Sequence, residues 1–295
     1  MNSNPIAVRL DALSTPAGPI RSPSDLRRSL IEASRLGVGG VELDARTHLR
    51  PEQLSGTAIR QIRKILEDHR LAISAVRFPT RRGYDVDERL QPRIDATKAA
   101  MRLAYSLGCN VLVNRVGNAP PPKPAEDTSG GDDPDADDAG RSFRETSAAD
   151  RHARWIGVLE DLAAFGAKTG CVLAARTSGI GGPALADALS RVRGGTLAAA
   201  LDPAGLLIGG HDIAPALRSL ADRLTVVYAT DAIRDPETHR GRPVEFGRGD
   251  ADYPSILAHL QSVDYDGPFI AGRPDTPASE TADAVSHLKQ LAVSG

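Results

Sequence analysis

The segment Asp95-Ala-Thr-Lys-Ala-Ala-Met-Arg-Leu-Ala-Tyr-Ser-Leu-Gly-Cys-Asn-Val-Leu-Val-Asn114 contains the unit from which we predict the fold. Residues 95–107 place apolar side chains at helical spacing, and Gly108 follows them as a typical helix end. A short continuous apolar run comes next, which is typical of a strand that is buried on both faces. The same order of helix, glycine and strand recurs at Gly37 and Gly170, so we predict that helices alternate with parallel strands.

Eight apolar runs along the chain predict strands. They cover residues 6–10, 40–44, 71–77, 110–114, 171–175, 196–201, 224–228 and 268–271. Amphipathic stretches predict helices over residues 24–36, 58–69, 95–107 and 155–167. Eight repeated units favour a single (β/α)8 TIM barrel formed by residues 1–295. The alternative, an open doubly wound sheet, usually has a glycine-rich phosphate-binding turn after its first strand, and none follows Leu10.

The composition excludes several classes of protein. The 295 residues include 36 Lys and Arg against 38 Asp and Glu, and the net charge of −2 argues against a nucleic-acid-binding protein. No apolar run reaches about 18 residues and no secretory signal is visible, so we expect a cytoplasmic protein without membrane spans. Cys109 and Cys171 each begin an apolar run and are expected to be buried, reduced core residues.

Residues 118–140 interrupt this pattern with an acidic insertion after the fourth predicted strand. The segment holds five Pro, six Asp, one Glu and one Lys, so its charge is −6, and it has no large apolar residue. Such a composition cannot offset the entropy that is lost on ordering, which predicts a flexible loop. A tolerated surface insertion and an acidic lid over the barrel mouth are both open interpretations.

Five short motifs carry a resemblance to a known family. They are Gly39-Gly-Val-Glu-Leu43, Leu201-Asp202, Asp231, Gly247-Arg-Gly-Asp-Ala-Asp-Tyr253 and Tyr265-Asp-Gly-Pro268. In this order they resemble the xylose isomerase-like TIM barrels, the sugar phosphate isomerase and epimerase family, over nearly the whole chain. The resemblance implies a barrel that acts on a sugar at the carboxyl ends of its strands.

The resemblance also implies a divalent metal ion. Family members commonly bind it through Glu, Asp, His and Glu at the ends of strands 5, 6, 7 and 8. The corresponding residues here are Arg176, Asp202, Tyr228 and Gly272. Three of the four expected ligands are therefore replaced, and a shift of one residue does not restore them. We expect neither a bound metal nor another cofactor in this chain.

Arg176 carries most weight in this expectation. Its guanidinium stays protonated in proteins, so it would repel a cation beside it. Two unit charges about 4 Å apart repel by about 4 kcal/mol at an effective dielectric constant of about 20, and a dication doubles this energy. We therefore predict that Arg176 fills the place of the metal and pairs with Asp202.

Further polar residues at predicted strand ends suggest a binding site for an anion. The candidate ligand-binding residues are Arg77, Arg115, Arg176, Asp231 and Arg273. A guanidinium offers two parallel donors to a carboxylate or a phosphate, which suits this role. The alternative is that these arginines point outward and reflect a chain with 31 Arg and only 5 Lys.

The candidate catalytic residues are Glu42, Arg176, Asp202 and Tyr228. Without a metal, Glu42 would act as a base, with Arg176 or Tyr228 as the electrophile that stabilises an enolate. Asp44, on the same predicted strand, is a second candidate base.

The sequence therefore predicts an isomerase- or epimerase-like protein that has lost its metal site and binds an anionic sugar, sugar acid or sugar phosphate. Two alternatives stay open. The chain can be a non-catalytic binding or regulatory pseudoenzyme, or a metal-free isomerase or lyase that uses Glu42. We expect no nucleic-acid partner, because the many His, Glu and Asp ligands of a trinuclear zinc endonuclease are missing. Homo-oligomers are left open.

Overall fold

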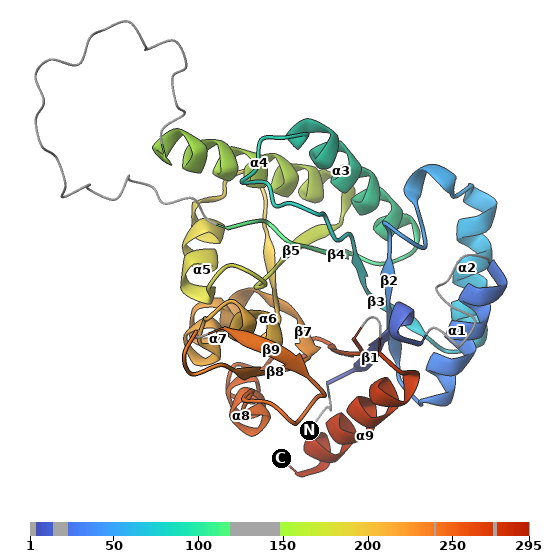
Figure 1. Ribbon diagram of the computed structural model, residues 1–295. Coiled ribbons are helices and arrows are strands. Elements are labelled where there is room, and N and C mark those ends of the chain that lie inside the picture. Colours follow the sequence, from blue (N-terminus) through green and yellow to red (C-terminus); the bar gives the residue numbers. More distant parts are fainter. Residues whose placement is uncertain (1–3, 14–22, 119–147, 239, 274–275, 295) are drawn as a thin grey trace, which may run out of the picture.

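Eight parallel strands close into a barrel in the computed structural model, which describes residues 4–13, 23–118, 148–238, 240–273 and 276–294 (Figure 1). The strands are β1 (Ile6–Arg9), β2 (Gly40–Asp44), β3 (Ala72–Arg77), β4 (Val111–Asn114), β5 (Val172–Arg176), β6 (Ala198–Leu201), β7 (Leu224–Ala229) and β10 (Phe269–Ala271). Each overlaps one of the eight predicted strands, and the predicted (β/α)8 class is confirmed. Except for Asn118, the predicted acidic insertion lies outside the described residues.

Helices surround the barrel on its outer face (Figure 1). They are α1 (Pro23–Arg35), α2 (Gly56–Asp68), α3 (Leu90–Ser106), α4 (Ala148–Thr169), α5 (Gly182–Arg191), α6 (Pro203–Ile208), α7 (Ile213–Leu220), α8 (Tyr253–Ser262) and α9 (Ala278–Ser294), with short 3-10 turns η1 (Leu10–Leu13), η2 (Pro51–Gln53) and η3 (Ala221–Arg223). Gly37, Gly108 and Gly170 have φ of 64°, 86° and 75°, the left-handed conformation that ends a helix at low cost for glycine. Within the described ranges, no helix is long and apolar enough to cross a bilayer.

A two-stranded antiparallel hairpin follows β7, and the sequence pattern did not predict it. It consists of β8 (Asp231–Arg234) and β9 (Gly241–Val244). Both strands are short and only partly buried, so neither has the continuous apolar run that marks the barrel strands. The hairpin extends the chain beyond the carboxyl end of β7, next to the candidate site.

Small and branched apolar residues fill the barrel and its contacts with the helices. In β5 and β6 the buried residues include Ala174, Ala175 and Ala199, whose small side chains leave room for the larger polar groups above them. Cys109 and Cys171 are free thiols that are 3% and 0% exposed, as the sequence predicted. Burial raises the pKa of Cys109 to about 11 and that of Cys171 to about 12, so both stay protonated at neutral pH.

Helices α5 and α7 approach closely at Gly182. A Cβ atom added there would lie 2.2 Å from the Cα of Ala216, so the two backbones would have to separate. We expect Gly182→Ala to lower the free energy of unfolding by about 1–3 kcal/mol, measured by urea denaturation. The control is Gly157→Ala in α4, where the new Cβ meets no atom within 4 Å. This control should raise the free energy of unfolding by about 0.5–1 kcal/mol, and equal stability of the two variants would contradict the packing argument.

Candidate active site

An ion pair between Arg176 and Asp202 joins the ends of neighbouring strands. Arg176 is the last residue of β5, and Asp202 follows β6 as the N-cap of α6. The Nε and Nη2 atoms of Arg176 both lie 2.9 Å from Oδ2 of Asp202. The predicted pairing is therefore confirmed, and it lies at the carboxyl ends of the strands, where TIM barrels place their active sites.

Two hydroxyl groups complete the surroundings of the Asp202 carboxylate. Ser178 donates to Oδ2 at 2.8 Å, and Thr230 donates to Oδ1 at 2.7 Å. Burial raises the pKa of Asp202, but the charge of Arg176 and these two hydrogen bonds outweigh it, and the resulting pKa lies below the ordinary value. Asp202 is therefore a carboxylate at neutral pH, with both oxygens already bonded.

Tyr228 links this ion pair to the opposite side of the barrel. The guanidinium carbon of Arg176 lies 4.2 Å from the centre of the Tyr228 ring, a cation–π contact. The hydroxyl of Tyr228, on β7, donates to Oε1 of Glu42, on β2, at 2.5 Å. Burial and the nearby charge of Glu42 raise the pKa of Tyr228 well above its ordinary value, so the phenol keeps its proton.

The other half of the site consists of charged residues from β1, η1, β2 and β3. Arg9 pairs with Asp11 at 2.9 Å, and Arg77 pairs with both Asp11 and Asp44, the latter at 2.7 Å. Glu42 lies between the two arginines, with Oε2 at 3.6 Å from Nε of Arg9 and 3.5 Å from Nε of Arg77. We call Arg9, Asp11, Glu42, Asp44, Arg77, Arg176, Asp202 and Tyr228 together the charged network.

Glu42 differs from the other carboxyl groups of the charged network in its burial and its hydrogen bonds. Its side chain is 0% exposed, and Oε2 has no hydrogen-bond partner in the described part of the chain. Burial raises the pKa of Glu42 above its ordinary value, although Arg9, Arg77 and the Tyr228 hydroxyl each lower it. A buried carboxyl group with a raised pKa and one unbonded oxygen has the properties of a general acid or base.

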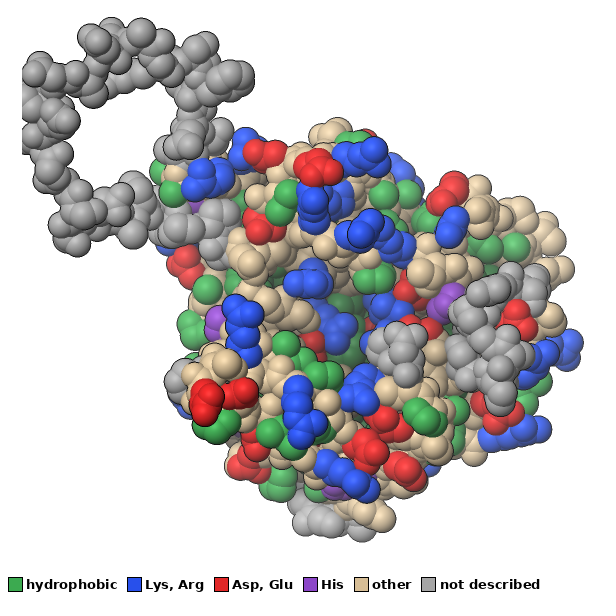
Figure 2. Space-filling model, in the orientation of Figure 1, with side chains coloured by type: hydrophobic (Ala, Val, Ile, Leu, Met, Phe, Trp, Pro, Cys, Tyr) green, Lys and Arg blue, Asp and Glu red, His purple; other side chains and the backbone are tan. Residues whose placement is uncertain are grey.

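The structure brings together five of the predicted site residues, namely Glu42, Arg77, Arg176, Asp202 and Tyr228. The other three, Arg115, Asp231 and Arg273, have different surroundings. Arg115 follows β4 and is exposed at the rim. Figure 2 shows Lys and Arg side chains around the middle of the molecular face onto which the barrel opens.

Asp231 holds the loop that follows the hairpin. Its Oδ1 accepts the backbone N–H groups of Ala232 and Ala251, and its Oδ2 accepts those of Gly247 and Gly249, at 2.8–3.1 Å. All of these bonds are internal, so the described contacts of Asp231 explain the Gly247–Tyr253 motif as a turn closed by one carboxylate.

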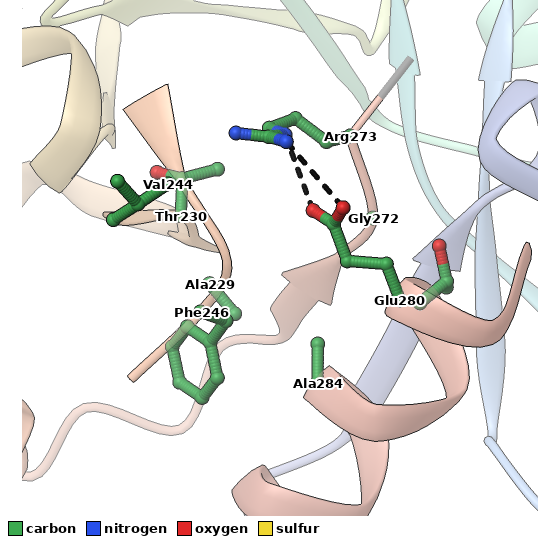
Figure 3. Close-up of a pocket in the computed structure, with 9 residues that line it drawn as sticks. Ala229, Thr230, Val244, Phe246, Gly272, Arg273, Glu280 and Ala284 are labelled. Atoms are coloured by element: carbon green, nitrogen blue, oxygen red, sulfur yellow. Dashed lines mark hydrogen bonds and ion pairs between the residues drawn. The ribbon is translucent and has the colours of Figure 1, made fainter. Parts of the chain in front are cut away.

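Arg273 lies beyond β10 and turns toward the helix that follows. Its Nε lies 3.2 Å from Oε1 of Glu280 in α9, and Figure 3 shows the two side chains facing each other beside Gly272. The positive charge of Arg273 is therefore balanced by a carboxylate outside the charged network.

Residues 30–291 match the family described as the xylose isomerase-like TIM barrel. The chain belongs to the xylose isomerase-like TIM barrel family. The resemblance inferred from the sequence motifs is thereby confirmed. No curated protein matches the sequence.

Solved structures with this fold include sugar epimerases. A xylose isomerase domain protein from Planctomyces limnophilus has a TM-score of 0.76 at 19% identity, covering 98% of this chain and 96% of its own. A xylose isomerase-like TIM barrel protein from Mycobacterium smegmatis, in complex with magnesium, has a TM-score of 0.70 at 17% identity, covering 100% of this chain and 99% of its own. A D-allulose 3-epimerase from Methylomonas sp. has 0.69 at 17%, covering 99% of both chains. At these identities the likeness concerns the fold.

The residues of this xylose isomerase-like barrel do not fit a divalent cation at the four positions implied by the family. Asp202 alone offers a carboxylate, and its oxygens are bonded to Arg176, Ser178 and Thr230. In the described ranges, no group of three or more His, Cys, Asp or Glu side chains is arranged to hold a metal ion. A cation at Asp202 would have to displace a guanidinium and would then lack further anionic ligands.

Sequence reasoning missed part of the charged network. Arg9 and Asp11 were not among the candidates, although a lone arginine at the end of the apolar run 6–10 was a visible signal. Ser178 and Thr230 were also missed, because a hydroxyl near a strand end is too common to stand out. Their roles depend on distances between strands that only the folded barrel provides.

The Arg176–Asp202 pair predicts a pH-dependent loss of stability in Arg176→Met. Near pH 7 the variant leaves a buried carboxylate without its counterion, and we expect the free energy of unfolding to fall by about 3 kcal/mol. The low pKa of Asp202 stabilises the unmodified protein above the ordinary aspartate pKa, and this contribution is lost as pH falls toward the lowered value. The difference between the two proteins should therefore be large from about pH 7 down to about pH 4 and shrink as pH falls further toward about pH 2.

Urea denaturation across that pH range measures this difference. The control is Arg191→Met, which removes an exposed ion pair with Asp187 and should change stability by less than about 1 kcal/mol. A difference for Arg176→Met that stays constant with pH would show that Asp202 does not depend on this guanidinium.

Proposed function

We propose that this chain binds a small anionic carbohydrate derivative, a sugar acid or a sugar phosphate, at the carboxyl end of its barrel, and that it does so without a divalent ion. The observation that carries the proposal is the ion pair between Arg176 and Asp202. It places a permanent cation where the family resemblance implies a metal ligand. A guanidinium can supply a carboxylate or phosphate ligand with the positive charge that a metal ion would otherwise supply.

Arg176 keeps hydrogen-bonding capacity for such a ligand. The Asp202 carboxylate pairs with Nε and Nη2 of Arg176, whereas Nη1 has no hydrogen bond to another described residue. The side chain is 21% exposed, so part of the guanidinium remains accessible from the barrel mouth. Burial lowers the pKa of Arg176, but Asp202, Tyr228 and Glu42 together raise it by more, so the pKa lies above its ordinary value and the group stays charged.

The ligand class is supported by the structural neighbours. They include an L-ribulose 3-epimerase and a D-allulose 3-epimerase in complex with D-allulose. A carbohydrate core with one anionic group is the simplest ligand that combines this fold with the arginines of the charged network.

The free, buried thiols of Cys109 and Cys171 support a reducing, cytoplasmic location.

Calorimetric titration with three related compounds tests the binding proposal. We expect saturable binding of D-gluconate or D-glucose 6-phosphate, no binding of neutral D-glucose, and no change when EDTA is added. Arg176→Met should weaken binding by about tenfold or more, because one charged hydrogen-bond donor contributes about 1.5–3 kcal/mol. Arg176→Lys keeps the charge without the planar donor pair and should give an intermediate affinity.

Arg191→Met serves as the control for the loss of a positive charge far from the barrel mouth. The proposal would be wrong if the anionic compounds bound only with Mg²⁺ or Mn²⁺ present. Equal affinity for neutral and anionic sugars would also contradict it.

A second candidate function is a metal-free isomerase or lyase reaction with Glu42 as the base. The observation in its favour is the buried Glu42 carboxyl group, with its raised pKa and its unbonded Oε2. Tyr228, which keeps its proton, would be the donor that stabilises an enolate. This function requires a ligand with a carbonyl next to an acidic C–H bond.

Proton exchange in D2O tests the role of Glu42. With a ketose phosphate as ligand, loss of the C–H signal in NMR spectra should speed up with pH through the raised pKa, because the base must be ionised. Glu42→Gln should slow exchange by about 100-fold. Tyr228→Phe removes a hydrogen bond that lowers the pKa of Glu42, so the midpoint should move to higher pH. Equal exchange in Glu42→Gln and the unmodified protein would rule out this base.

A further inference from the structure

A second basic site lies outside the charged network, in a cavity of about 700 Å³ between the loop after β2, the segment 78–89 that joins β3 to α3, and the first turns of α3. Five arginines line it: Arg46, Arg81, Arg82, Arg89 and Arg93. Glu88 is the single acidic residue among the described residues of the lining, which together carry a net charge of +4. Such a concentration of one charge attracts anions from solution.

Three of these arginines have structural partners. Arg93 donates from Nη1 and Nη2 to three backbone carbonyls within 78–89, at 2.6–2.9 Å, and so fixes the shape of that segment. Arg46 donates to a further backbone carbonyl of the segment at 2.9 Å. Arg82 pairs with Glu88. Because carbonyl groups do not cancel a full charge, Arg93 and Arg46 still contribute positive potential to the cavity.

Arg81 and Arg89 differ from these three. Both are exposed, and neither side chain has a hydrogen bond or ion pair to another residue that the structure describes. They stand at opposite ends of the segment 78–89, one shortly after β3 and one at the start of α3. Two guanidiniums on the same cavity, without a partner among the described residues, can each offer a pair of donors to phosphoryl oxygens.

The start of α3 adds to the positive potential. Arg89 is its N-cap residue, with φ of 53° and no side-chain hydrogen bond to the helix, and the first turn contains no acidic residue. Helix N-termini usually have Ser, Thr, Asp or Asn at this position, since the helix dipole and free N–H groups favour negative charge. The positive charges of the arginines at this end of α3 are repelled by the positive end of the helix dipole. A bound anion would reduce that repulsion.

The cavity is also large enough for more than one phosphate. Its volume is within the range of about 300–1,000 Å³ that is usual for small-molecule sites, and Phe78 and Ala96 give it an apolar wall. We propose that this cavity binds a small compound with two adjacent phosphoryl groups, held by Arg81 and Arg89. The site is separate from Arg176 and Asp202, and it does not depend on the function proposed above.

Calorimetric titration of the full chain with inorganic pyrophosphate tests this proposal. We expect saturable binding with one site per chain that weakens as salt is raised. The double variant Arg81→Ala/Arg89→Ala should bind at least about tenfold more weakly. Arg63→Ala, an exposed arginine of α2 outside the cavity lining, should bind within about twofold of the unmodified protein. Urea denaturation of each variant shows that it is folded.

Two results would overturn the proposal: pyrophosphate heats that do not saturate, or equal affinities of the double variant and Arg63→Ala. Arg176→Lys should leave pyrophosphate binding unchanged, and a loss there would assign the anion to the barrel mouth instead. ADP distinguishes the sources of the ligand. If ADP binds more tightly than pyrophosphate, the ligand of the cavity is an esterified diphosphate. If ADP binds equally or more weakly, the ligand is free diphosphate.

Discussion

The guanidinium of Arg176 is held from two sides, by the carboxylate of Asp202 and by the ring of Tyr228. This contact fixes the ends of β5, β6 and β7 relative to one another. It also sets the chemistry of the barrel mouth, because a permanent cation in this position needs an anionic partner and excludes a second cation. The Ser178 and Thr230 hydroxyls then supply the remaining hydrogen bonds of that carboxylate.

Tyr228 makes the charged network continuous across the barrel. Its ring contacts Arg176, while its hydroxyl bonds to Glu42, which lies between Arg9 and Arg77. Three guanidiniums thus face four carboxyl groups in a largely buried volume. When a ligand or a proton changes the charge on one side of the barrel, the electrostatic potential on the other side changes too, because these contacts are short.

Much of the fold could be predicted from the sequence, because barrel strands buried on both faces form continuous apolar runs and glycines mark the helix ends. The β8–β9 hairpin could not, since its strands are short and partly exposed. The Arg176–Asp202 pair followed from charge balance at adjacent strand ends. The ion pair of Arg273 with Glu280 could not be predicted in this way, because a long side chain can turn to a carboxylate in a neighbouring helix.

Mn²⁺ binding, measured by electron paramagnetic resonance, tests whether the Arg176 guanidinium takes the place of a divalent cation beside Asp202. We expect Mn²⁺ added to the purified, EDTA-treated protein to stay free in solution, with the same spectrum for the unmodified chain and for Asp202→Asn. One tightly bound Mn²⁺ per chain that is lost in Asp202→Asn would instead show that a metal ion binds at this carboxylate.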